Sequence, residues 1–311
     1  MGQQLREVRL SGFLVSVHCP TEALLKIRID TTHLSWEEYR ALLRELQDHL
    51  AFVDEQYAKR TPKIRSILAD HKRIKEVGGI RRKRELEFSP FPSRFANIIK
   101  NNVRARVYDL LARYALVIQR MARGRAERNL YLLPENLAGE FVKGIEKVNE
   151  KIDELNDMIE EYDLEPIREI LRKYDLDLPK SSFYIPYVEV DLTPITIGPE
   201  VIEEWAEKSP EVANLLDAKR RELVEKVIMD VRKRLEPIIQ ALAGERRLLK
   251  IKERLSMLKE QVEGLGLKAL ADSIIVPLIK ASENPEKAFE ILGDRPDRFV
   301  SGRVEALLKA L

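Results

Sequence analysis

The 311-residue chain has one cysteine, four histidines and few aromatic side chains, which make up 6% of the total. A single cysteine, Cys19, cannot form an intramolecular disulfide, and it excludes a zinc module built on several cysteines. No apolar run reaches the roughly 18 residues that a membrane-spanning helix needs. The N-terminus also lacks the apolar segment of a signal peptide. We therefore expect a cytoplasmic protein that has no contact with a membrane.

Sequence motifs that carry chemistry are missing as well. The chain has no glycine-rich phosphate loop and no His-Glu-x-x-His pair. The histidines are His18, His33, His49 and His71, and none lies four residues from another on one expected helix. His18 and Cys19 are neighbours on an expected strand, so their side chains should point to opposite faces. We expect no metal site, no cofactor and no enzymatic activity.

Charged residues are abundant, at 34% of the chain, and side-chain amides are scarce, with 7 glutamines and 9 asparagines. Proteins of hyperthermophiles show this bias, and so does a long helical protein. The charges are segregated along the chain. Residues 59–128 carry 20 basic and 6 acidic side chains, a net charge of +14, whereas residues 129–211 carry 8 basic and 21 acidic ones, a net charge of −13.

The basic segment supplies the candidate functional residues, because a sequence-independent phosphate-binding surface is built from clustered arginine and lysine. The candidates for binding a nucleic acid or another polyanion are Arg81, Arg82, Lys83, Arg84, Arg106, Arg113, Arg120, Arg123 and Arg125. The alternative, which we favour, is that these charges pair within the fold or with a partner protein. Direct packing of the basic helix on the acidic helix over 134–162 would not provide such ion pairs. The positions that flank the apolar stripe of the acidic helix hold no acidic residue, and two of them are Asn149 and Asn156.

Most of the chain has the pattern of helices. Ser35 with Glu38 forms a capping box for a helix that runs to about residue 57. A basic helix is expected from Pro62, a loop over 80–92, a long helix over 93–121 and another over 134–162. The remaining helices are expected at 165–174, 199–207, 210–242, 246–263, 267–280, 285–292 and 298–310.

Strands are expected in two places. Apolar residues nearly alternate over 8–17, with a slip at Ser11-Gly12 that predicts a bulge, and again over 25–29. We predict that these two runs form an antiparallel hairpin. A later strand is expected near 183–192, at a sheet edge because Pro186 interrupts it.

Two segments carry heptad spacing. Apolar residues follow a 4-3-4-3-4 pattern from Val103 to Met121 and again from Phe141 to Ile159. A loop of about ten residues joins them, and this arrangement predicts an antiparallel helical hairpin. The acidic residues of 146–161 fall at the outer heptad positions, which indicates a solvated face rather than a set of metal ligands.

The order of elements, with the stretch Tyr131-Leu132-Leu133-Pro134-Glu135-Asn136 ahead of the acidic helix, resembles an uncharacterised family encoded beside MoxR-type AAA+ ATPases in bacteria, phages and archaeal mobile elements. The resemblance covers about residues 8–242 and carries over no catalytic residue. It implies an accessory protein of an ATPase system.

We therefore predict a mainly α protein with long helices, a coiled-coil-like antiparallel helical hairpin and a small antiparallel sheet made of the N-terminal hairpin and one later strand. Three consecutive domains are expected, at 1–92, 93–242 and 243–311. The predicted function is a non-catalytic scaffold or adaptor that binds protein partners, one of them an AAA+ ATPase, or that self-associates through its heptad helices. The alternative is a protein that binds DNA or RNA without sequence specificity.

Overall fold

A computed structural model describes residues 8–58, 74–77, 85–119, 129–179, 182–242, 248–284, 288–293 and 295–310. It is mainly helical, with small antiparallel sheets, and it divides into two compact units. Unit 1 consists of residues 1–18, 108–145 and 189–311, and unit 2 consists of residues 19–107 and 146–188. The units therefore interleave along the chain, and their boundaries do not coincide with the expected ones after residues 92 and 242.

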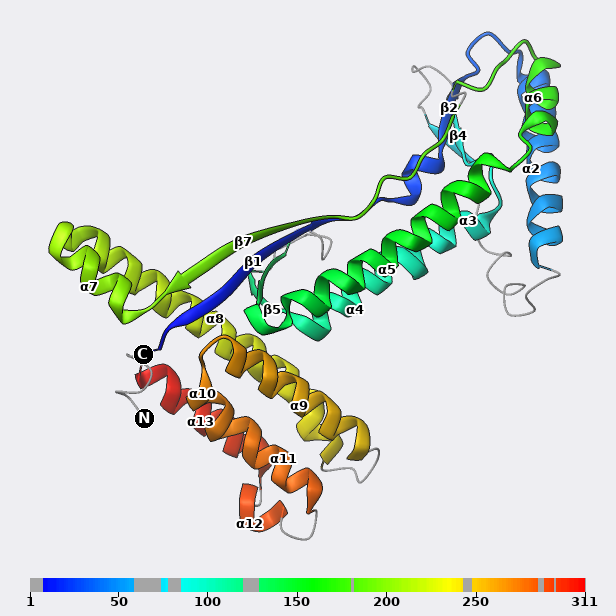
Figure 1. The fold of residues 1–311 in the computed structure, drawn as a ribbon. Coiled ribbons are helices and arrows are strands. Elements are labelled where there is room, and N and C mark those ends of the chain that lie inside the picture. The colour runs from blue at the N-terminus through cyan, green and yellow to red at the C-terminus, as the bar shows by residue number, and fades with distance from the viewer. Residues whose placement is uncertain are drawn as a thin grey trace. The chain divides into compact units, whose positions relative to one another are not determined.

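Unit 1 contains a four-stranded antiparallel sheet in the order β5-β6-β1-β7. Its strands are β1 (Leu10–His18), β5 (Leu116–Gln119), β6 (Leu130–Leu133) and β7 (Glu189–Ile197). The long strands β1 and β7 run side by side in one continuous register, with Leu10 opposite Ile197 and His18 opposite Glu189 (Figure 1). β7 lies at the edge of this sheet, as expected for the later strand. Pro186, on which that expectation rested, lies outside β7, which contains Pro194 instead.

The helices of unit 1 share one apolar core with this sheet. They are α7 (Pro199–Lys208), α8 (Pro210–Leu242), α9 (Leu248–Gly264), α10 (Lys268–Leu270), α11 (Val276–Glu283), α12 (Ala288–Leu292) and α13 (Pro296–Ala310), with a π-helical segment at Ala271–Ile275. The core joins apolar side chains of the sheet, such as Leu10 and Leu132, to Val227 of α8, Leu255 of α9 and Leu278 of α11. These side chains are fully buried, so hydrophobic burial holds unit 1 together.

Unit 2 contains a three-stranded antiparallel sheet in the order β2-β4-β3, next to helices α2 and α6 (Figure 1). Its elements are β2 (Ile27–Asp30), β3 (Lys75–Val77), β4 (Glu85–Phe88), α2 (Trp36–Ala58), α3 (Ser93–Asn97) and α6 (Glu165–Arg172). Leu42 and Leu46 of α2, Leu86 and Phe88 of β4 and Leu171 of α6 form its buried core. The capping box is confirmed, because Ser35 N donates to Glu38 Oε2 (2.8 Å) and Glu38 N donates to Ser35 Oγ (3.2 Å).

Two helices, α4 (Ala105–Tyr114) and α5 (Glu135–Glu160), contribute residues to both units. The heptad side chains of α5, from Phe141 to Ile159, are buried as predicted. The expected helix to residue 121 is wrong beyond Tyr114, because residues 116–119 form β5, and Val117 therefore belongs to a strand. β5 pairs with β6, which falls in the expected loop, because both are runs of apolar residues that complete the sheet.

The buried side chains between Phe95 and Ala115 do not follow the 4-3 heptad spacing that the sequence predicted. They are Phe95, Ile99, Val103, Val107, Leu111 and Ala115, spaced four residues apart. The cause is a π-helical segment, Ile98–Arg104, between α3 and α4. An α-helix repeats every 3.6 residues, and the wider turns of a π-helix raise the average. Leu110 and Tyr114, which the heptad pattern placed in the seam, are half-buried.

Two strand predictions are also wrong. The runs at 8–17 and 25–29 do not pair with each other, because β1 joins β6 and β7, whereas β2 joins β4. No bulge interrupts β1 at Gly12, where the register with β7 is continuous. The apolar alternation slips at Gly12 because β6 passes too close for a side chain. A Cβ atom at Gly12 would lie 2.5 Å from the Leu133 carbonyl oxygen of β6. Residues 85–88, expected as loop, form β4 because they lie between two strands.

The remaining predicted helices lie close to their expected bounds, from α6 through α13. The basic helix expected from Pro62 falls outside the described residues. Among the described helices, none has both the length and the apolar content that crossing a membrane requires.

Candidate functional site

The predicted polyanion-binding residues are only partly described. Arg106 and Arg113 are both exposed and lie seven residues apart on α4. The Arg113 guanidinium lies over the ring of Tyr114, 5.3 Å from its centroid. Within the described ranges, neither arginine forms an ion pair. The other candidates lie outside the described residues, namely Arg81, Arg82, Lys83, Arg84, Arg120, Arg123 and Arg125.

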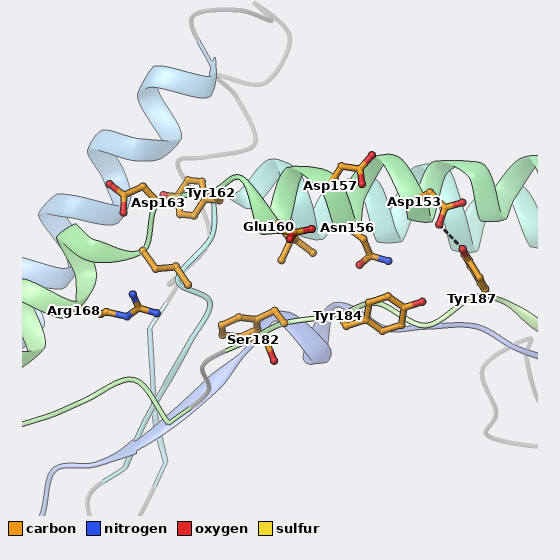
Figure 2. A pocket seen from close by; sticks show the side chains of 13 residues that line it. Asp153, Asn156, Asp157, Glu160, Tyr162, Asp163, Arg168, Ser182, Tyr184 and Tyr187 are labelled. Carbon is orange, nitrogen blue, oxygen red and sulfur yellow. Dashed lines mark hydrogen bonds between the residues drawn. The ribbon is translucent and has the colours of Figure 1, made fainter.

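A groove of about 630 Å³ in unit 2 is lined by several carboxylates and tyrosines (Figure 2). It lies between the C-terminal part of α5, the turn that leads to α6, and an extended segment, residues 182–188. We call it the acidic groove. Its polar residues are Asp153, Asn156, Asp157, Glu160, Tyr162, Asp163, Arg168, Ser182, Tyr184 and Tyr187.

Asparagines of α5 hold the extended segment in place. Asn156 donates through Nδ2 to the Ile185 carbonyl (3.0 Å) and accepts from the Ile185 amide through Oδ1 (2.9 Å). One heptad earlier, Asn149 Oδ1 accepts from the Val188 amide at 2.9 Å. Asn156 thus satisfies both backbone groups of a buried residue, as a neighbouring strand would. The wall of the groove is fixed by these bonds.

Aromatic rings also hold this wall in place through contacts with one another. Phe183 packs edge-on against Phe91, with ring centroids 4.8 Å apart. Tyr162 lies 5.5 Å from Phe91 and 5.8 Å from Phe95 by the same measure. Such pairs stabilise a cluster beyond the area that they bury. The neighbouring rings of Tyr184 and Tyr187 remain open to solvent, with exposed fractions of 61% and 45%.

The charge of the groove is strongly negative. Asp153, Asp157, Glu160 and Asp163 are exposed. Among the described residues that line the groove, the one cation is Arg168, which pairs with Glu165 at 3.4 Å. Tyr187 donates from its hydroxyl to Asp153 Oδ1 (2.5 Å), and this bond raises the pKa of the tyrosine. In the part of the chain that the structure describes, no group of three or more metal-ligating side chains has the geometry of a metal site. The groove can bind a cation by charge and by ring face.

The histidines and the cysteine are dispersed. His18 ends β1 and is exposed, Cys19 is half-buried, and His49 is half-buried on α2. His33 is exposed, with Nε2 3.3 Å from the Tyr174 carbonyl oxygen. His71 lies outside the described residues.

A second pocket, of about 810 Å³, lies within unit 1, and we call it the α8–α9 pocket. Its floor is a polar clamp at the end of α4. Arg234 of α8 donates to Asp230 Oδ2 (2.8 Å) and to the carbonyl oxygens of Ala112 (2.9 Å) and Ala115 (2.8 Å). Gln261 of α9 donates to the Arg113 carbonyl. The carbonyls at a helix C-terminus lack intrahelical donors, and the clamp supplies them.

Comparison with known proteins adds no relative, since no protein-family model, curated protein or solved structure matches the chain.

Sequence reasoning missed both pockets. One sequence feature could have indicated the acidic groove. Asn149 and Asn156 occupy equivalent heptad positions on a helix that is otherwise rich in charged residues. Polar amides at that spacing on one helix face point to a backbone partner alongside. The α8–α9 pocket had none, because its residues come from four separate stretches of the chain.

Proposed function

We propose that the protein is a non-catalytic scaffold or adaptor that binds a lysine- or arginine-containing segment of a partner protein in the acidic groove. The observation that carries this proposal is the combination of four exposed carboxylates with two exposed tyrosine rings on a wall held by Asn149 and Asn156. Carboxylates attract ammonium and guanidinium groups, and aromatic faces bind the same cations. A basic segment of a partner satisfies both features.

The groove is better suited to binding than to catalysis. A catalytic site needs a nucleophile or base, a group that orients it and a group that stabilises developing charge. The bond to Asp153 raises the pKa of Tyr187 further above its ordinary 10.0, so this tyrosine is a poor base at neutral pH. The carboxylates are exposed to water, where they attract cations.

A peptide titration tests this proposal. A short fluorescein-labelled peptide of alternating lysine and glycine should bind the protein, and a glutamate–glycine peptide should not. The double variant Asp157→Asn, Glu160→Gln should weaken binding about tenfold, which corresponds to ~1.4 kcal/mol. The matched control is Glu146→Gln, Glu150→Gln, which removes two exposed charges of the same helix outside the groove. Equal affinities for the two double variants would refute the proposal.

The wider setting that we propose follows the family resemblance. The protein works in the cytoplasm as an accessory of an AAA+ ATPase system, and its composition fits a thermophile. Its α4 and α5 helices act as a coiled-coil-like hairpin that supports partner binding or self-association. Close packing supports this pairing, since a Cβ atom at Gly144 of α5 would lie 2.5 Å from Leu110 Cδ2 of α4.

Sequence-independent binding of DNA or RNA is the second candidate, and the exposure of Arg106 and Arg113 favours it. Duplex DNA should then bind at low salt and weaken steeply as salt rises, with a slope of about −0.9 per neutralised phosphate. The variant Arg106→Glu, Arg113→Glu should reduce that slope, whereas Arg40→Glu, Arg44→Glu on the exposed face of α2 should not. Absence of binding to micromolar protein at low salt would eliminate this candidate.

A further inference from the structure

We infer that the α8–α9 pocket binds an amphipathic organic anion, that is, a carboxylate or phosphate attached to an apolar body. This site is separate from the acidic groove and does not depend on the function proposed for it. The volume of about 810 Å³ lies within the roughly 300–1,000 Å³ that ligand pockets occupy.

The apolar part of the ligand is the first element of the inference. Ile238 of α8 and Leu258 of α9 are buried, and Met257 and Val117 are half-buried beside them. These side chains line the pocket together with Tyr131 of β6. Apolar walls of this kind favour a hydrocarbon chain or ring, and the unbranched side chain of methionine adapts to ligands of different shape.

The polar floor gives the pocket a fixed form. Arg234 and Gln261 donate to the carbonyl oxygens of Ala112, Arg113 and Ala115, and Arg234 also neutralises Asp230. The Val117 amide donates to the same carboxylate at 3.1 Å. Because these groups are occupied with one another, they shape the pocket and leave ligand recognition to its rim.

Cations outnumber acids at this rim. Arg113, Lys233 and Arg254 are exposed there, against Asp109 and Glu253. Throughout the described ranges, Lys233 and Arg254 form no ion pair. They come from α8 and α9, which also supply the apolar walls. A ligand with its apolar body against Ile238 and Leu258 therefore places its head group beside unpaired cations, and arginine suits carboxylate and phosphate alike.

A displacement experiment tests the inference. 8-Anilinonaphthalene-1-sulfonate is an amphipathic anion, and its fluorescence should rise on binding to the native full chain. Decanoate should displace it, and decyltrimethylammonium at the same concentration should not. The variant Lys233→Ala, Arg254→Ala should weaken binding of the dye about tenfold. The variant Met257→Trp should block the dye by filling the pocket.

The matched control is Lys268→Ala, Lys280→Ala, which removes two exposed lysines of unit 1 that lie outside the pocket. It should bind the dye with wild-type affinity, and thermal unfolding should show that all variants are folded. Three results would each overturn the inference: no binding to the wild type, equal displacement by the cationic detergent, or equal affinities for the pocket and control double variants.

Discussion

Arg234 of α8 joins separate chain segments in unit 1, because it bonds to the end of α4 and to Gln261 of α9. It connects α8 to the end of α4 and neutralises Asp230, whose side chain is 3% exposed. Replacing one member of a buried ion pair leaves the other charge without compensation. We therefore expect Arg234→Leu to lower the free energy of unfolding by about 3–5 kcal/mol. Urea titration should show this loss, and Lys233→Leu on the neighbouring exposed position should stay within about 0.5 kcal/mol of the wild type.

Tyr174 links α6 to α2, because its hydroxyl donates to Glu45 Oε1 (2.7 Å) while Lys173 Nζ donates to Oε2 (2.8 Å). Burial, followed by the bond to Glu45, raises the pKa of Tyr174 to about 12 from an ordinary 10.0. A raised pKa contributes stability that is complete below the unfolded value and is lost as pH rises through the folded value.

Tyr174→Phe should therefore lower the free energy of unfolding by about 1 kcal/mol at neutral pH, as loss of one hydrogen bond does. It should also abolish the part of the stability that the wild type loses between pH 10 and 12. On the acid side, the bonds from Lys173 and then Tyr174 lower the pKa of Glu45 below its ordinary 4.5, so that stability is lost as pH falls below 4.5. Urea titrations of the wild type and Tyr174→Phe at pH 4, 7 and 11 would measure the acidic and the alkaline loss of stability. An equal loss in both proteins between pH 7 and 11 would contradict the role given to Tyr174.

At the scale of elements, the extended wall of the acidic groove depends on Asn156 and Asn149 of α5. Asn156→Ala removes both side-chain bonds to Ile185 and leaves two buried backbone groups unsatisfied. We expect amide hydrogen exchange at Ile185 to accelerate by at least about tenfold. Exchange along the buried face of α5 should not change. Glu150→Ala, an exposed change on the same helix, is the control and should leave Ile185 protected.

Elements with a strong local signal could be predicted from the sequence, and those that depend on distant partners could not. The capping box at Ser35 and the buried stripe of α5 are local patterns, and both are confirmed. The short strands β4 and β6 are only four residues long, and each has one partner far away in the chain, β2 for β4 and β1 for β6. The π-helical segment at Ile98–Arg104 shifted the stripe period to four, which a heptad pattern cannot represent.

At the scale of the whole molecule, each unit has its own core, built from residues of that unit. Leu42→Ala in unit 2 and Leu255→Ala in unit 1 each empty a fully buried position, at a cost of about 2–5 kcal/mol. We expect each change to accelerate hydrogen exchange mainly in its own unit, because sub-global opening follows cooperative units. Peptide-resolved exchange would measure this, and equal acceleration in both units from either change would show a single cooperative fold instead.

The candidate site shows the same limit on prediction at this scale. The sequence identified the segregation of charge, including the exposed Arg106 and Arg113. It did not identify the acidic groove, because α5 and residues 182–188 converge only in the folded chain. Acidic residues that the heptad pattern assigned to a solvated face are indeed exposed, and some of them border the groove.

The pairing of β1 with β7 also has a consequence for the newborn chain. About 170 residues separate the two strands, and they include every residue of unit 2. A ribosome that adds about 5–20 residues per second needs roughly ten to thirty seconds to make that stretch. The last residue of unit 2, Val188, directly precedes β7, so all of unit 2 is synthesised before β7 can pair with β1. The synthesis of unit 2 therefore ends before that of unit 1, which still needs residues 189–311. Unit 2 can fold while these residues are being made.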